Sequence, residues 1–131
     1  MKSLLLIFTL LFSTLMFSSP SCAKWEKVTD DVYGTTFYLD FGRIRKDDGY
    51  VYAWILVDYL KTYKDGYLSG EVYVQGDCKL FRIKSLSYVH HKEPMSGGTG
   101  DLQKPTGKNG NWTYPAPNSP GKTILKSVCS R

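Results

Sequence analysis

The residues best suited to metal chemistry stand in one short stretch, His90-His91 followed by Glu93. Imidazole and carboxylate groups are common metal ligands. The two histidines are adjacent, however, and neighbouring side chains of a strand point to opposite faces, so they would not easily share one ion. We therefore expect no metal site here and interpret the stretch as a solvated strand end.

Catalytic arrangements are not favoured elsewhere in the sequence. A Ser-His-Asp set could be assembled from distant positions, but the chain has no GxSxG nucleophile turn. The carboxylate pairs Asp30-Asp31 and Asp47-Asp48 have the character of solvated turns, whereas acid–base pairs need one carboxyl group in apolar surroundings. The segment MSGGTG lacks the GK[ST] ending of a phosphate-binding loop. We expect a non-enzymatic protein with no catalytic residues, no metal and no cofactor.

The first residues, MKSLLLIFTLLFSTLMF, place one lysine before an apolar run. This is the pattern of a secretory signal peptide, and the run is short for a membrane-spanning helix of about 20 residues. Small residues at Ser21 and Ala23 predict cleavage after Ala23, which leaves a single domain over residues 24–131 and a signal peptide over 1–23. The alternative is lipidation of Cys22, which is disfavoured because the preceding residues lack the large aliphatic side chain of a bacterial lipoprotein signal.

The cysteine count agrees with export. The full chain has three cysteines, which would leave one unpaired thiol in an oxidising compartment. Removal of the leader leaves Cys78 and Cys129, and two distant cysteines in a small exported domain suggest one disulfide. In the chain-entropy model, closing a loop of this length stabilises the fold by about 4 kcal/mol.

The first half of the domain predicts an antiparallel β meander, because short β-rich segments alternate with Gly and Asp turns. The expected strands cover Thr35–Phe41, Tyr50–Tyr59, Leu68–Gln75 and Cys78–His90. The second of these is apolar on both faces, as in a covered central strand. Tyr52, Trp54 and Tyr73 are expected to pack on this sheet.

The second half has a different composition, with 11 Gly and Pro residues between Pro94 and Gly121. We expect a Gly/Pro-rich surface loop over 92–111, followed by Trp112 and Tyr114 docked on the domain.

The chain then ends in a short helix. Ser119 has the type of an N-cap residue and Pro120 suits the first helical position. Ile124, Leu125 and Val128 follow at helical spacing. Cys129 would tie this helix to the strand beginning at Cys78. The fold class is therefore α+β and mostly β.

The composition favours binding. The formal net charge is +5, and the chain has ten tyrosines and three tryptophans. An exported protein rarely meets nucleic acid, so acidic polymers, an anionic membrane surface or host proteins are the expected partners, unless the charge only aids solubility. The candidate binding residues are aromatic anchors and the lysines near them: Tyr63, Tyr67, Trp112, Lys61, Lys64, Lys104 and Lys108.

Four segments carry a family resemblance: FYLDFGRIRKDDGYVYAWILVDY, GDCKLFRIKSLSYVHHKEPMSGG, WTYPAPNSP and the terminal VCSR. They resemble the surface-adhesin protein E-like family of small exported bacterial proteins, from about Trp25 to Cys129. The most specific elements are the Tyr38-x-Asp40-x-x-x-Ile44 start and the Asp77-Cys78-Lys79 triplet. The resemblance implies an antiparallel sheet with a C-terminal helix held by a disulfide.

The resemblance also implies an adhesin. The family's characterised member is an outer-membrane lipoprotein that binds host extracellular-matrix and serum proteins, including vitronectin, laminin and plasminogen. A protein partner of this kind is thus expected, and contact with a membrane only if Cys22 is lipidated. The competing hypothesis is a soluble periplasmic protein with an inhibitory or envelope-associated role, such as a binder of lysozyme.

Overall fold

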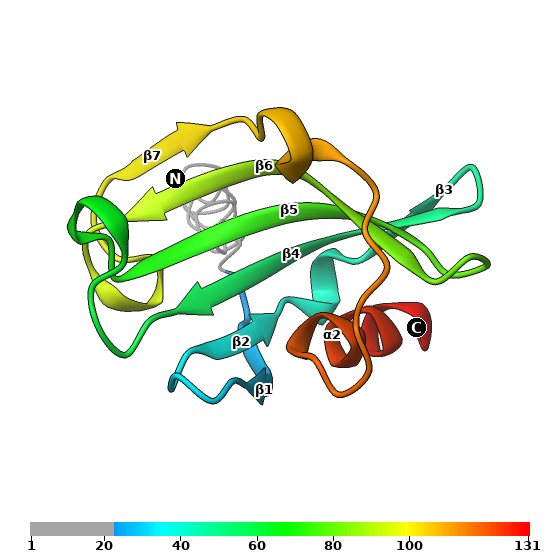
Figure 1. The fold of residues 1–131 in the computed structure, drawn as a ribbon, viewed down its shortest axis with the longest axis horizontal. Coiled ribbons are helices and arrows are strands. Elements are labelled where there is room, and N and C mark those ends of the chain that lie inside the picture. Colours follow the sequence, from blue (N-terminus) through cyan, green and yellow to red (C-terminus); the bar gives the residue numbers. More distant parts are fainter. Residues whose placement is uncertain (1–22) are drawn as a thin grey trace, which may run out of the picture.

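The computed structural model describes residues 23–131, and within them seven strands form one antiparallel sheet in the order β1-β2-β4-β5-β6-β7, with β3 also paired to β4 (Figure 1). The strands are β1 Glu26–Asp30, β2 Thr36–Leu39, β3 Arg45–Asp47, β4 Tyr50–Asp58, β5 Ser69–Asp77, β6 Arg82–His91 and β7 Gly100–Gln103. Short 3₁₀ turns cover Phe41–Arg43 (η2), Lys64–Gly66 (η3), Pro94–Ser96 (η4) and Gly107–Gly110 (η5), and helix α2 covers Pro120–Cys129. The predicted fold class is confirmed. The signal peptide and Cys22 lie outside the described residues.

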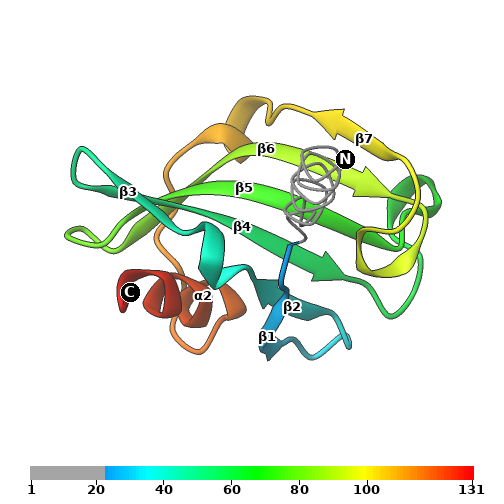
Figure 2. The same cartoon turned by 180° about the vertical axis from the view of Figure 1, so that it is seen from behind.

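Helix α2 covers part of one sheet face, at the end of the sheet that carries the β5–β6 hairpin (Figures 1 and 2). Ser119 caps it as predicted, because its Oγ accepts a hydrogen bond from the amide of Lys122 at 3.2 Å. The apolar side of the helix closes the core, whose buried members are Leu39, Val51, Ala53, Ile55, Val74, Ile124 and Val128.

Gly76 of β5 allows the helix to come close to the sheet. A Cβ atom on Gly76 would lie 2.8 Å from Val51 Cγ2 and 3.0 Å from Leu125 Cδ1. Leu125 is fully buried. Since real Cβ atoms do not approach so closely, the missing side chain is what lets Leu125 pack directly over β5.

The Cys78–Cys129 disulfide joins the last turn of α2 to the sheet, with the two Cα atoms 5.7 Å apart. The disulfide is as expected, but the prediction that Cys78 begins a strand is wrong. Cys78 lies in the turn between β5 and β6, and β6 begins at Arg82. The helix is therefore fastened to a hairpin tip, where the turn places the cysteine towards the helix.

The same hairpin turn is organised by Asp77. Its Oδ1 accepts hydrogen bonds from the amides of Lys79 and Leu80, each at 3.1 Å. Its Oδ2 accepts one from Arg82 Nε at 3.0 Å. The bond from the Leu80 amide, followed by the ion pair with Arg82, holds the pKa of Asp77 below its ordinary value. Asp77 thus fixes the turn that carries Cys78.

The segment expected to be a loop, residues 92–111, is more ordered than predicted. It contains the edge strand β7, which pairs with β6, and the turns η4 and η5. Hydrogen bonds hold η4 on the sheet, because the Met95 amide donates to Asp58 Oδ1 at 2.9 Å and the Ser96 amide to Ser69 Oγ at 2.9 Å. Such long-range pairing leaves no periodic signal in a Gly- and Pro-rich sequence.

The sheet face opposite α2 carries a row of aromatic and arginine side chains. Trp54 stacks on Tyr73 with ring centroids 4.8 Å apart, and Tyr73 stacks on Tyr52 at 6.1 Å. The guanidinium of Arg45 lies 4.4 Å from the Tyr52 ring, and that of Arg43 lies 5.6 Å from Trp54. The expectation that Tyr52, Trp54 and Tyr73 pack on the sheet is confirmed.

Candidate binding site

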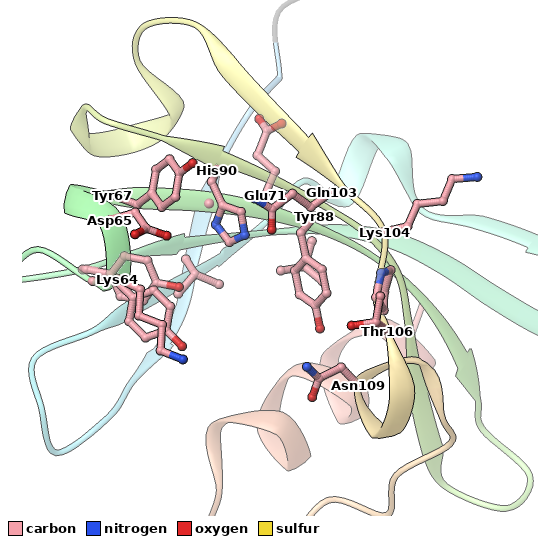
Figure 3. A pocket seen from close by; sticks show the side chains of 16 residues that line it. Lys64, Asp65, Tyr67, Glu71, Tyr88, His90, Gln103, Lys104, Thr106 and Asn109 are labelled. Atoms are coloured by element: carbon pink, nitrogen blue, oxygen red, sulfur yellow. The ribbon is translucent and has the colours of Figure 1, made fainter.

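The sheet face under α2 continues beyond the helix and forms the floor of a cavity. Alternate residues of a strand share one face, so Val57 lies on the same side of β4 as the core residues Ala53 and Ile55. Val57 pairs with Gly70 of β5, next to Val72. Val57, Gly70 and Val72 line a cavity of about 370 Å³ (Figure 3). Pockets for small ligands span about 300–1,000 Å³, so this cavity is at the small end of that range.

One wall of the cavity comes from the β4–β5 loop. Tyr59 and Tyr63 stack with ring centroids 5.0 Å apart, and the amide of Tyr63 donates to the carbonyl of Tyr67 at 2.7 Å. The next turn, η3, is fastened from outside because Lys92 Nζ donates to the carbonyl of Asp65. Burial raises the pKa of the Tyr59 hydroxyl. The two tyrosines are thus held by a closed loop and do not depend on a ligand for their position.

A second wall is a stack of three rings, Tyr67, His90 and Tyr88, which Figure 3 shows side by side. The His90 ring centroid is 4.8 Å from that of Tyr67 and 6.0 Å from that of Tyr88. The Tyr67 hydroxyl donates to Asp101 Oδ2 at 2.6 Å, and this bond raises the pKa of the tyrosine. Among the described residues, the buried His90 Nδ1 has no hydrogen-bond partner.

The third side of the cavity is polar. Gln103 ends β7, Thr106 follows it, and Asn109 belongs to η5. In Figure 3 the Asn109 amide and the Tyr88 hydroxyl lie towards one another across the enclosed space. These side chains come from a different segment than the tyrosine wall, so the cavity exists only in the folded protein.

Beside the cavity lies a second hollow, lined by Tyr33, Leu60, Lys61 and Tyr63 among others. We call these four residues the rim. Leu60 and the β1–β2 turn meet there because Gly34 has no side chain: a Cβ atom on Gly34 would lie 2.7 Å from Leu60 Cδ2. Apart from Lys61 the rim side chains are apolar or aromatic, and they are open to solvent, with Tyr33 82%, Leu60 70% and Tyr63 49% exposed.

The β1–β2 turn that presents Tyr33 is held by Asp31. The Asp31 Oδ1 atom accepts hydrogen bonds from the amides of Tyr33 at 2.9 Å and Thr35 at 3.0 Å. The positive φ of Gly34, 82°, suits glycine at the tip. Tyr33 is therefore exposed on a fixed turn and not on a free end.

The structure brings some of the candidate binding residues together and separates others. Tyr63, Tyr67, Lys64 and Lys104 all border the cavity, and Lys61 borders the rim hollow. Tyr67 is buried, so it serves as wall and not as exposed anchor. The residues that sequence reasoning missed are Tyr33, Leu60, Tyr59, Tyr88 and His90.

Trp112 and Lys108 belong elsewhere. Trp112 is docked on the domain as expected, stacked on Tyr50 at 5.7 Å with the Arg82 guanidinium 4.4 Å from its ring. Neither Trp112 nor Lys108 borders the cavity or the rim hollow. Tyr114, by contrast, is 66% exposed.

The interpretation of His90-His91 as a solvated strand end is wrong. His91 is buried, and Gly100 of β7 lies against its ring. The two rings do take opposite faces, since His90 borders the cavity and His91 lies on the face covered by η4. Within residues 23–131 no group of three or more His, Cys, Asp or Glu side chains is placed to hold a metal ion.

Comparison with known proteins identifies the family. A family model described as surface-adhesin protein E matches residues 25–130. The chain belongs to the surface-adhesin protein E family. Membership in this family implies an adhesin-like protein of the cell surface.

Solved structures agree with the family assignment. The structure of Haemophilus influenzae protein E is 14% identical, covers 86% of this chain and 89% of its own, and superposes with a TM-score of 0.60. Protein E from non-typeable Haemophilus influenzae is 15% identical, with coverages of 86% and 80% and a TM-score of 0.57. At this identity the surface-adhesin protein E fold is shared, but individual contacts are not transferable. A search of curated proteins found no significant match.

The described part of this family member has no helix with the length and apolar character needed to cross a membrane.

Proposed function

We propose that the chain is an exported, non-enzymatic adhesin that binds a host extracellular-matrix or serum protein through the rim of Tyr33, Leu60, Lys61 and Tyr63. The observation that carries this proposal is the composition of the rim. Three large apolar or aromatic side chains from two separate loops are exposed beside one another. Exposed apolar groups that gather in this way mark interaction sites on soluble proteins.

Charged groups of both signs surround the rim, since Asp31 borders the rim hollow and Asp65 and Glu71 border the cavity. Among them, three lysines would pair with acidic groups of a protein partner. Lys61 belongs to the rim, and Lys64 and Lys104 border the adjoining cavity. All three are exposed. A few anchor residues, among which tyrosine is enriched, supply most of the binding energy at protein interfaces. Surrounding charges mainly steer the encounter and set its salt dependence.

Substitution Tyr33→Ala is expected to weaken binding to the host protein about tenfold, which is the loss of roughly 1.4 kcal/mol typical of an interface anchor. The measurement is the equilibrium dissociation constant for immobilised vitronectin, laminin and plasminogen in moderate salt. The matched control is Tyr114→Ala, because Tyr114 is also exposed but does not border the rim hollow.

Two outcomes would contradict this function. Equal losses of affinity for Tyr33→Ala and Tyr114→Ala would show that the rim does not form the interface. If the protein binds lysozyme but none of the three host proteins, the periplasmic inhibitory role is favoured instead.

We further propose that export ends with cleavage after Ala23, which leaves Lys24 as the first residue. The backbone nitrogen of Lys24 lies 3.3 Å from Asp40 Oδ2, and Asp40 is buried. Cleavage there would turn this nitrogen into an ammonium group beside a buried carboxylate, which already accepts a bond from Arg43 Nε at 2.7 Å. The Asp40 carboxylate would then lie beside two cationic groups, the new ammonium and the Arg43 guanidinium.

Intact-mass measurement of the exported protein tests the cleavage site. We expect a chain of residues 24–131 without lipid. A chain beginning at a lipidated Cys22 would contradict this expectation and assign a membrane anchor to the adhesin.

A further inference from the structure

The cavity beside the rim has a composition that a protein-docking surface does not need. Its floor is apolar, from Val57 and Val72, and its walls include polar side chains, of which Figure 3 shows those of Tyr88 and Asn109 directed inwards. His90 Nδ1 is buried and, within the described residues, has no hydrogen-bond partner. This atom is closed off by protein atoms, and a Cβ atom on Gly70 would lie 3.7 Å from it. A ligand would therefore be recognised by the other polar side chains that line the cavity.

The groups around the cavity are hydrogen-bonding and uncharged for the most part. The hydroxyls of Tyr88 and Thr106 and the amides of Gln103 and Asn109 each donate and accept. A ligand that matches them needs several donors and acceptors within a small volume. Apolar surface on the same ligand must also cover the valine floor.

The charges that border the cavity do not favour an ionic ligand. Figure 3 shows Glu71 and Lys104 directed away from the enclosed space. The remaining charged neighbours are Lys64 and Asp65, one of each sign and adjacent in the η3 turn. An anion and a cation would therefore each meet one attractive and one repulsive group.

We propose that this cavity binds a single uncharged sugar residue, a hexose or N-acetylhexosamine, of a glycan. A pyranose ring carries hydroxyl groups around its edge and C–H groups on its faces, which matches polar walls over an apolar floor with tyrosine rings beside it. The volume of about 370 Å³ suits a ligand smaller than the drug-sized molecules that fill larger pockets. Glycan binding is an activity separate from the contact of the rim with a host protein.

The test is a titration of the exported protein with free sugars, in which binding is monitored through the backbone amide NMR signals. The probes are glucose, galactose, N-acetylglucosamine and N-acetylgalactosamine, with glucuronic acid and glucosamine as charged counterparts. We expect at least one neutral sugar to give saturable shifts at Gly70, Gln103 and Asn109. Saturation with the charged sugars alone, or with none of the six, would overturn the proposal.

Two variants locate the binding site. Tyr88→Phe and Asn109→Ala each remove one hydrogen-bonding group and are expected to raise the dissociation constant about threefold to tenfold. The matched controls are Tyr38→Phe and Asn111→Ala, neither of which borders the cavity. Equal effects of variants and controls would overturn the assignment to this cavity. Tyr33→Ala is expected to leave sugar binding unchanged. A failure of the sugar-binding proposal can therefore be distinguished from a failure of the host-protein proposal.

Discussion

Replacing Cys129 with serine is expected to lower the free energy of unfolding by about 4 kcal/mol. The disulfide to Cys78 closes a loop with a sequence separation of 51 residues, and the bond limits the conformations of the unfolded chain. The loss would be a large share of the 5–15 kcal/mol, roughly, that a domain of this kind has in total. The measurement is equilibrium unfolding in urea, followed by tryptophan fluorescence.

The control for this prediction is the wild-type protein in a reducing agent, which should unfold at the same urea concentration as the variant. Cys78→Ser should give the same loss, and the double variant should lose no more, because all three remove one bond. A loss below about 1 kcal/mol in every case would show that the packing of α2 alone holds the helix on the sheet.

Substitution Leu125→Ala is expected to cost about 3 kcal/mol of folding free energy. Leu125 is fully buried and packs over Gly76, where the helix comes closest to the sheet. Leucine-to-alanine changes in protein cores cost about 2–5 kcal/mol, because the lost contacts and the residual cavity both contribute. The disulfide would still hold the end of the helix, so the variant should unfold at a lower temperature but remain folded at neutral pH. Thermal unfolding with intact disulfide provides the measurement.

Lys122→Ala is the matched control for Leu125→Ala, since Lys122 is an exposed residue of the same helix. For Lys122→Ala we expect the free energy of unfolding to change by less than about 0.5 kcal/mol. Alanine is the best helix former, so neither variant loses helix propensity. Comparable losses for the two variants would mean that the buried contact with β5 does not decide the stability of α2.

The central strands and the helix could be predicted because their signals are local. Tyr50–Asp58 is a long apolar run, and Ser119-Pro120 before Ile124 and Leu125 marks a helix start. Strands β1, β3 and β7 were missed. Their sequences EKVTD, RKD and GDLQ are short and mostly exposed, so no alternation of apolar and polar residues marks them. They form because a neighbouring strand offers unpaired backbone groups, which is a tertiary effect.

The binding region was predictable only in part, for a similar reason. Tyr63 and Lys64 stood out as aromatic and basic residues in a turn, and they do border the cavity. Tyr88 and His90 alternate on β6 like ordinary sheet residues. Nothing in their sequence shows that helix α2 covers one half of their sheet face and stops short of the other. The position of α2 is set by the disulfide and by Gly76, both of which act over a long sequence distance.

The proposed function depends on the rim as the surface by which this protein E family member binds a host protein. The most direct test is the dissociation constant of the double variant Tyr33→Ala/Tyr63→Ala for whichever host protein the wild type binds, with folding checked by thermal unfolding. We predict at least about a thirtyfold weaker complex, equivalent to the 2 kcal/mol or more that interface anchors contribute. A folded double variant that binds as tightly as the wild type would contradict the claim.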